Sequence, residues 1–292
     1  MRFLDVKTDY AFKKVFGSTE SKPILISFLN ALIGFPPGKE IADLAIVDPY
    51  QIPMLQGMKD TYVDVKATLA DGRHIIVEMQ VLNVKGFEQR ILYNAAKCYS
   101  RQLDAGEDYT LLNPVIALTL TDFNLFEGEE CTSRFLLLEK ERFIQYRDDI
   151  ELIFIELPKF TLEEGQLATL KDKWLYFVKN AGRLAVVPKA LDEAPWQAAF
   201  AIANTAGLSE EELDAQERRH DFIRLQRGAL EKAYEDGLNE GEARGRAKAM
   251  AEGEHAKALA VARRLLPLLG DAAIAEAAGL ELETVARLRR EA

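Results

Sequence analysis

The sequence predicts an α/β fold, with a mixed central sheet flanked by helices and an α-helical C-terminal extension. Residues 61–81 alternate apolar and polar side chains around an Ala-Asp-Gly turn, which is typical of a β-hairpin. A helical pattern at 87–105 separates this hairpin from an apolar strand at 115–123, so a parallel crossover is expected. From about residue 207 the chain is rich in Glu, Arg, Ala, Lys and Leu, which favours helix.

The N-terminal part is expected to be helical. Apolar residues recur at helical spacing between residues 8 and 34, and Gly17-Ser18 interrupts the pattern before a second helix start at Ser21 and Pro23. A strand is expected at 43–48, followed by the hairpin at 61–81. Further strands are expected at 133–138 and 151–157, and helices after Thr161, with breaks at Pro188 and Pro195.

Two of these elements should be buried. The strand at 115–123 is continuously apolar, as expected for a strand covered on both faces of its sheet. The helix at 87–105 is amphipathic and is stopped by Gly106. Its inward positions are expected to be Ile91, Leu92, Ala95, Ala96 and Tyr99.

The composition excludes several classes of protein. No stretch approaches the roughly 18 apolar residues of a membrane helix, the N-terminus is polar, and only two cysteines occur, so we expect a cytoplasmic protein without membrane association. The net charge of −10 argues against non-specific coating of nucleic acid. Residues 1–120 carry 13 basic and 14 acidic residues against 24 and 33 in residues 121–292, so a nucleic-acid site is expected in the first part.

The Ala-Asp-Gly turn predicts the register of the hairpin. A three-residue loop with glycine in the left-handed position pairs Leu69 with Arg73 and places Asp64 opposite Glu78. A two-residue Asp-Gly loop would instead send the two acids to opposite faces. The hydrophobic pattern favours the first register, because it gathers the apolar residues on one face. That face carries Val63, Val65, Ala67, Leu69, Ile75, Val77, Met79 and Val81, and the other carries Asp64, Lys66, Glu78 and Gln80.

Two carboxylates directly opposite each other need a physical reason. Their Cβ atoms would lie about 4.5–5.5 Å apart, which is destabilising unless a cation lies between them or one is protonated. Carboxylate oxygens suit Mg²⁺ or Mn²⁺, which can hold a phosphodiester and activate water. Lys66 or Gln80 would then polarise the water or hold the phosphate. The alternative is a solvated sheet face with scattered charges, and the geometry alone leaves both open.

Basic residues near this hairpin are candidates for DNA contact. Arg90, Lys97 and Arg101 lie at positions i, i+7 and i+11 of the second helix, one face that could follow a DNA backbone. Lys13 of the first helix is a further candidate. The alternative for all four is an ordinary solvated helix face.

These residues resemble a known family. Asp64, followed by V-E-M-Q at 77–80, resembles the D-x(n)-(E/D)-x-K core of the PD-(D/E)XK nuclease superfamily, with glutamine in the lysine position. The ordered segments around it resemble the Rpn family of recombination-promoting nucleases and transposases. The matching segments are TDYAFKKVFG (8–17), VDVKATLADGRHIIVEMQ (63–80), FEQRILYNAAKCYSRQLDAGEDY (87–109), VIALTLTDFNLF (115–126) and the glycine-punctuated tail.

The resemblance implies a restriction-endonuclease-like core whose active edge is formed by strands 61–69 and 74–81. It implies an Mg²⁺- or Mn²⁺-dependent DNA endonuclease linked to recombination or mobile elements. Asp64, Glu78 and the Met79 carbonyl would be metal ligands. Asp9 would complete the set, although an acid in a first helical turn is also favoured by the helix dipole. Gln80 would orient water or phosphate without supplying charge, and Lys66 would substitute for the lysine.

The tail is expected to form a second domain, residues 207–292, after a nuclease-like domain of residues 1–206. Small residues recur every fourth position from Gly237 to Gly253, which indicates either close approach of two helices, as in a homodimer, or a marginal helix. Residues 271–290 have a helix-turn-helix-like pattern that also fits a simple αα-hairpin. Because of Gln80 and the acidic tail, two alternatives to the nuclease stay open. One is a catalytically decayed fold that acts as a DNA-binding or oligomeric interaction module, and the other is a structural protein that associates through its tail.

Overall fold

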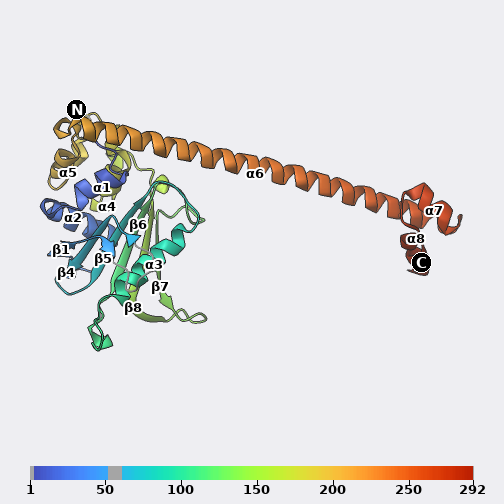
Figure 1. Cartoon of the computed structure of the whole chain (residues 1–292), viewed down its shortest axis with the longest axis horizontal. Helices are drawn as coiled ribbons and strands as arrows, with labels where there is room; N and C mark the ends of the chain where they lie inside the picture. The colour runs from blue at the N-terminus through green and yellow to red at the C-terminus, as the bar shows by residue number, and fades with distance from the viewer. Residues whose placement is uncertain (1–2, 52–60, 292) are drawn as a thin grey trace. The chain divides into compact units, whose positions relative to one another are not determined.

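The computed structural model describes residues 3–51 and 61–291 of the chain, and its centre is a six-stranded mixed sheet (Figure 1). The strand order is β1-β4-β5-β6-β8-β7. The strands are β1 (Leu44–Val47), β4 (Val65–Leu69), β5 (His74–Gln80), β6 (Val115–Thr121), β7 (Thr132–Leu138) and β8 (Gln145–Glu156), and β2 (Tyr50–Gln51) pairs separately with β3 (Thr61–Tyr62). β5, β6 and β8 run parallel, and the other neighbours in the large sheet are antiparallel. The predicted α/β fold, with its parallel crossover, is confirmed.

Helices cover both faces of this sheet. The helices are α1 (Asp9–Phe16), α2 (Lys22–Ile33), α3 (Phe87–Ser100), α4 (Leu170–Asn180), α5 (Trp196–Ala203), α6 (Glu210–Leu265), α7 (Asp271–Ala278) and α8 (Leu282–Glu291). The larger core cluster packs α1, α2, α4 and α5 against one face. The smaller cluster packs α3 against the other, where α3 contacts β6 and β8 (Figure 1). β6 is buried along its whole length, as its apolar sequence predicts.

The hairpin has the predicted register. Val65 pairs with Val77, and the N–H of Leu69 donates to the carbonyl of Arg73 at 2.8 Å. Gly72 closes the turn with φ +92°, a backbone conformation that favours glycine. Because of this register, the chain at Asp64 lies opposite the end of β5, and the Asp64 N–H donates to the Val77 carbonyl at 3.1 Å.

Three details of the hairpin region differ from the prediction. The first strand is not continuous from 61 to 69, because the strand is interrupted at residues 63–64, between β3 and β4. Val63 therefore packs with Ile76 and Phe87 under α3, not with Val65 on the opposite face. The strands expected at the active edge are internal: β4 lies between β1 and β5, and β5 lies between β4 and β6.

Other boundaries also shift. α3 ends at Ser100, and Leu92 and Ala96, expected to face inward, are exposed. Asn94 and Lys97 occupy buried positions instead. β8 begins at Gln145, six residues before the predicted start, because its first half pairs with β7 as a two-stranded ribbon, beyond the point where β6 pairing ends.

The chain divides after Arg224 into two compact units. In the second unit, the end of α6 packs with α7 and α8 around Ala262, Leu266, Ile274, Val285 and Leu288, so the predicted αα-hairpin forms. α6 is helical throughout despite its glycines. A Cβ added at Gly237, Gly241, Gly245 or Gly253 would meet no atom of the described chain within 4 Å, so no helix of this chain packs on that stripe there. No described helix is long and apolar enough to cross a membrane.

Candidate active site

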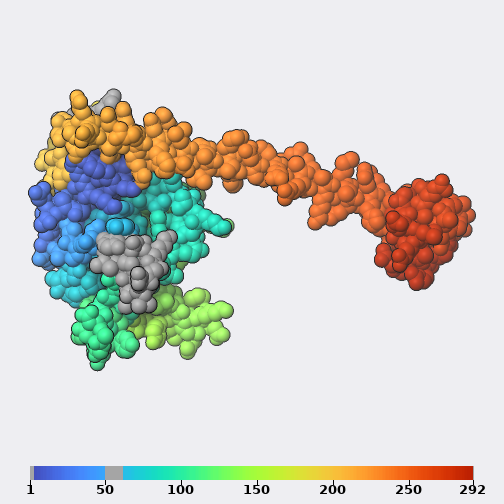
Figure 2. Space-filling view, in the orientation of Figure 1, coloured from blue at the N-terminus to red at the C-terminus, as the bar shows by residue number. Residues whose placement is uncertain are grey.

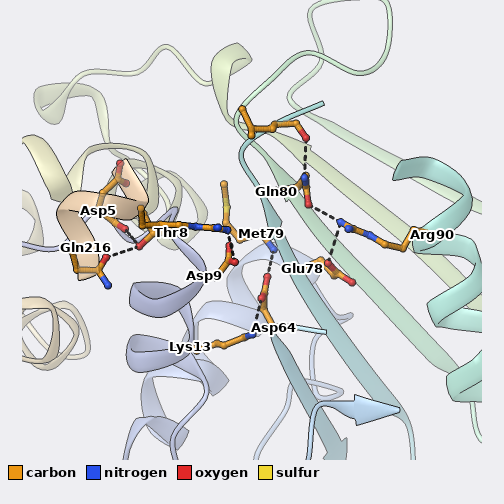
Figure 3. Close-up of polar contacts among 12 residues, drawn as sticks. Asp5, Thr8, Asp9, Lys13, Asp64, Glu78, Met79, Gln80, Arg90 and Gln216 are labelled. Atoms are coloured by element: carbon orange, nitrogen blue, oxygen red, sulfur yellow. Dashed lines mark hydrogen bonds and ion pairs between the residues drawn. The ribbon is translucent and has the colours of Figure 1, made fainter. Parts of the chain in front are cut away.

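Asp64 and Glu78 lie at the carboxyl end of β5, beside the interruption of the strand that precedes β4. Asp64 accepts the backbone N–H of Met79 through Oδ2 at 2.8 Å, which fixes its carboxylate at the strand end (Figure 3). Its other oxygen lies 3.4 Å from the ammonium of Lys13, which reaches over from α1. Asp64 is therefore held between a strand backbone and a helix on the larger-core side.

Glu78 is approached from the other side of the sheet, by α3. Glu78 is only 7% exposed. Asn94 Nδ2 donates to Glu78 Oε1 at 2.8 Å, and Arg90 Nη2 lies 3.8 Å from Oε2 (Figure 3 shows the Arg90 contact). The expectation that both acids project from one flat face therefore needs correction. The break at residues 63–64 turns Asp64 toward α1, and the acids meet at the strand end.

The electrostatics of this pair leave it short of positive charge. Burial and, to a smaller extent, the nearby Asp64 carboxylate together raise the pKa of Glu78 to about 7, against the opposing effects of Arg90, Asn94 and Lys13. Burial also raises the pKa of Asp64, although the Met79 N–H and Lys13 oppose the shift, and the charge of Asp9 adds to it. A bound cation would reverse both shifts, so the donor set fits a hard divalent metal.

Asn94 is a site residue that sequence reasoning missed. It is 0% exposed, and its Oδ1 is a buried acceptor without a hydrogen-bond partner among the described residues. Such an orphaned acceptor beside two carboxylates is expected where a hydrated cation binds, because metal-bound water donates hydrogen bonds. The available signal was its spacing: Asn94 lies four residues after Arg90 and three after Ile91, on the inward and mostly apolar face of an amphipathic helix.

Asp9 is tied to the beginning of α6. Its Oδ2 accepts from Arg219 Nη2 at 2.6 Å. Two neighbouring contacts hold the same helices together: Thr8 Oγ1 donates to Gln216 Oε1 at 3.3 Å, and the Tyr10 hydroxyl donates to Glu212. Figure 2 shows the start of α6 lying directly against the N-terminal residues. The first turns of α6 are thus part of the wall around Asp9, which the composition break at residue 207 did not predict.

The remaining predicted residues are distributed unevenly. Gln80 ends β5 and bonds to Arg90. Lys66 lies nearer the turn. Burial lowers the pKa of His74, and the charge of Lys66 lowers it further. Burial raises the pKa of the Cys98 thiol, and the charge of Lys66 opposes that rise. Lys97 is only 4% exposed and lies 5.8 Å from the ring of Tyr93, so the expected exposed basic stripe on α3 is wrong. Arg101 is half-buried just past the end of α3.

Within residues 3–51 and 61–291, no group of three or more His, Cys, Asp or Glu side chains is already arranged to hold a metal ion. The pair Asp64 and Glu78 would therefore need backbone or water ligands, which Mg²⁺ accepts readily.

A family model described as PD-(D/E)XK nuclease family transposase matches residues 6–233, which include the whole sheet, the site and the first turns of α6. No curated protein and no solved structure matches the chain.

Proposed function

The chain belongs to the PD-(D/E)XK nuclease family transposases, and from this premise we propose that it is a divalent-metal-dependent DNA endonuclease linked to recombination or mobile elements. The observation that supports this most is the nearly buried pair Asp64 and Glu78 at the end of β5, in which Glu78 has a pKa of about 7. Burying two carboxylates together is costly unless the site exists to bind a cation.

The proposed ligands of Mg²⁺ or Mn²⁺ are Asp64, Glu78 and the Met79 carbonyl, with Asp9 as a further carboxylate. A metal so bound would polarise a phosphodiester oxygen and activate the attacking water. The Met79 N–H holds Asp64 in place, and Asn94 does the same for Glu78. Lys13 lies 3.4 Å from Asp64 and Arg90 lies 3.8 Å from Glu78, and both are proposed to bind phosphate oxygens of the DNA.

The test is cleavage of supercoiled plasmid with Mg²⁺ or Mn²⁺. We expect Asp64→Ala and Glu78→Ala each to lower the rate by about 1,000-fold or more, since each removes a charge that holds the metal. Glu88→Ala removes an exposed carboxylate from the first turn of α3 and serves as the matched control. Equal nicking by the wild type and both site variants would refute the proposal.

A second candidate is a catalytically decayed nuclease fold that acts as a DNA-binding or oligomeric module. Two ion pairs favour it: Lys13 with Asp64 and Arg219 with Asp9 partly neutralise the acids without a metal. Titration calorimetry separates the two candidates. The nuclease binds Mn²⁺ with an affinity that Asp64→Ala abolishes, whereas the decayed fold binds DNA but gives no heat with Mn²⁺.

We also propose that the tail makes a homodimer, with the small-residue stripe of α6 packed against that of a second copy. The open space over its glycines supports close approach of another helix. Truncation after Arg224 retains the turns of α6 that contact α1 and removes the stripe. Light scattering should then give a dimeric mass for the full chain and a monomeric mass for the truncated one. Equal oligomeric states would refute the dimer.

A further inference from the structure

Gln80 stands where related nucleases carry a lysine, and both of its polar atoms are already engaged. Its Nε2 donates to the Leu82 carbonyl at 2.8 Å, and its Oε1 accepts from Arg90 Nη2 at 2.6 Å (Figure 3). These two bonds fix the orientation of the amide and leave it one N–H and one oxygen lone pair. Gln80 holds the guanidinium of Arg90 in position.

Arg90 is placed to act on substrate. The same Nη2 lies 3.8 Å from Glu78 Oε2, and the side chain as a whole is 39% exposed, so Arg90 borders both the buried acid and solvent. Its Nε is buried and has no hydrogen-bond partner among the described residues. The guanidinium lies 5.6 Å from the ring of Phe87, one turn earlier on α3. The group is thus anchored on three sides but retains unused donor capacity.

We propose that Arg90 supplies, from α3, the positive charge that the D-x(n)-(E/D)-x-K motif carries on the strand, and that Gln80 is the positioning residue that holds it there. This rests on the proposed nuclease function. Arg90 would donate to non-bridging oxygens of the phosphate under attack and stabilise the charge that develops on them. A guanidinium does not exchange protons with substrate, so the site gains electrostatic stabilisation without a proton-transfer group.

Lys13 is the competing candidate, and the contacts argue against it. Its ammonium lies 3.4 Å from Asp64, on the α1 side of the site, and it acts on Glu78 through its charge, more weakly than Arg90 does. Lys13 projects from a helix, and its side chain is 44% exposed. Arg90, by contrast, donates a hydrogen bond directly to Gln80, the residue in the lysine position.

The first experiment moves the charge back to the strand. Arg90→Ala should lower kcat for plasmid cleavage about 100-fold with little change in KM, as for other preorganised stabilisers. Gln80→Ala should lower kcat about tenfold, because the guanidinium of Arg90 is no longer held in position. Gln80→Lys in the Arg90→Ala background should recover at least about tenfold of the loss, because lysine then supplies the charge from the strand. Lys85→Ala, an exposed cation just before α3, should match the wild type.

A double variant no faster than Arg90→Ala, or an Arg90→Ala variant within about threefold of wild type, would overturn the inference. The second experiment does not depend on cleavage. Removing a cation 3.8 Å from Glu78 should strengthen Mn²⁺ binding to Arg90→Gln by about threefold or more in calorimetry. Weakened or unchanged Mn²⁺ binding would indicate a merely structural arginine.

The two proposals fail differently. If the wild type does not cleave DNA but Arg90→Gln binds Mn²⁺ more tightly, the nuclease function fails while the charge assignment at the metal site stands. If the wild type cleaves in an Asp64-dependent manner and neither Arg90 experiment gives the expected result, the nuclease stands and the role of Arg90 fails.

Discussion

Two buried glutamates at the carboxyl ends of two parallel strands have opposite electrostatic environments. Glu156 ends β8 and is 0% exposed. Burial alone would raise its pKa, but the Lys159 ammonium at 2.7 Å and the N–H groups of Leu125 and Phe126 hold the pKa below its usual value. Glu78, near the end of β5, receives a single side-chain hydrogen bond from Asn94, and its pKa rises to about 7.

The two glutamates differ in how far their negative charge is balanced within the fold. Glu156 has a full set of partners within the fold, so its charge holds the 123–126 loop and Lys159 together and leaves little for a ligand. Glu78 is buried to a similar degree but faces a second acid, so its charge is incompletely balanced. An unbalanced buried charge persists where a ligand balances it, which is why the metal site is proposed at β5 and not at β8.

The largest expected effect is on Glu156. Glu156→Gln should destabilise the first unit by about 3–5 kcal/mol, because it leaves the Lys159 ammonium buried without its counter-charge. Trp174 and Trp196 are both buried in this unit, so their fluorescence during urea unfolding reports on it alone. Glu193→Gln, which removes an exposed partner of Lys173, should change stability by less than about 1 kcal/mol. Equal changes in the free energy of unfolding for the two variants would mean that Glu156 stabilises the fold no more than an exposed carboxylate does.

Glu78 should behave in the opposite way in metal-free protein. Its folded pKa of about 7 exceeds the ordinary value of 4.5, so the stability that its neutral form contributes is present below pH 4.5 and is lost as pH rises through 7. Glu78→Gln keeps an acceptor for Asn94 and cannot ionise. It should therefore match wild type near pH 4 and exceed it by up to about 3 kcal/mol at pH 8.

The comparison between the variant and wild type also removes the contribution of His74, whose pKa is lowered by burial and by the charge of Lys66. Chelator-treated protein and the same tryptophan fluorescence supply the measurement. A Glu78→Gln variant less stable than wild type at pH 8 would mean that Glu78 is balanced within the fold, as Glu156 is.

How far the sequence predicted this site depends on the range of the interactions involved. The turn at Gly72 is local, so it predicted the hairpin register and brought Asp64 and Glu78 to the same strand end. Periodicity reports which face of a helix is apolar but not what the polar members of that face contact. For that reason it missed Asn94 and placed Lys97 on the surface, although the long stem of a lysine is easily buried.

Contacts between distant segments were beyond the sequence altogether. Asp9 meets Arg219 across 210 positions, and nothing in either local pattern indicates the other. The break at residues 63–64 also depends on tertiary contacts, since Asp64 turns to accept the Met79 N–H and Val63 turns to pack under α3. The strand propensity of TYVDVKATL was real, but these contacts overrode it at its centre.

The smallest expected effect is on metal affinity, and it tests the same imbalance from the ligand side. A cation competes with the proton on Glu78, so Mn²⁺ affinity should be nearly constant above pH 7 and fall about tenfold, roughly 1.4 kcal/mol, per unit below it. Calorimetry in two buffers of different ionisation enthalpy should show about one proton released per Mn²⁺ at pH 6 and far fewer at pH 8. Glu193→Gln should give the same profile as wild type. A Mn²⁺ affinity independent of pH between 5.5 and 7 would mean that Glu78 is already ionised in the metal-free site, and the contrast with Glu156 would then lose its electrostatic basis.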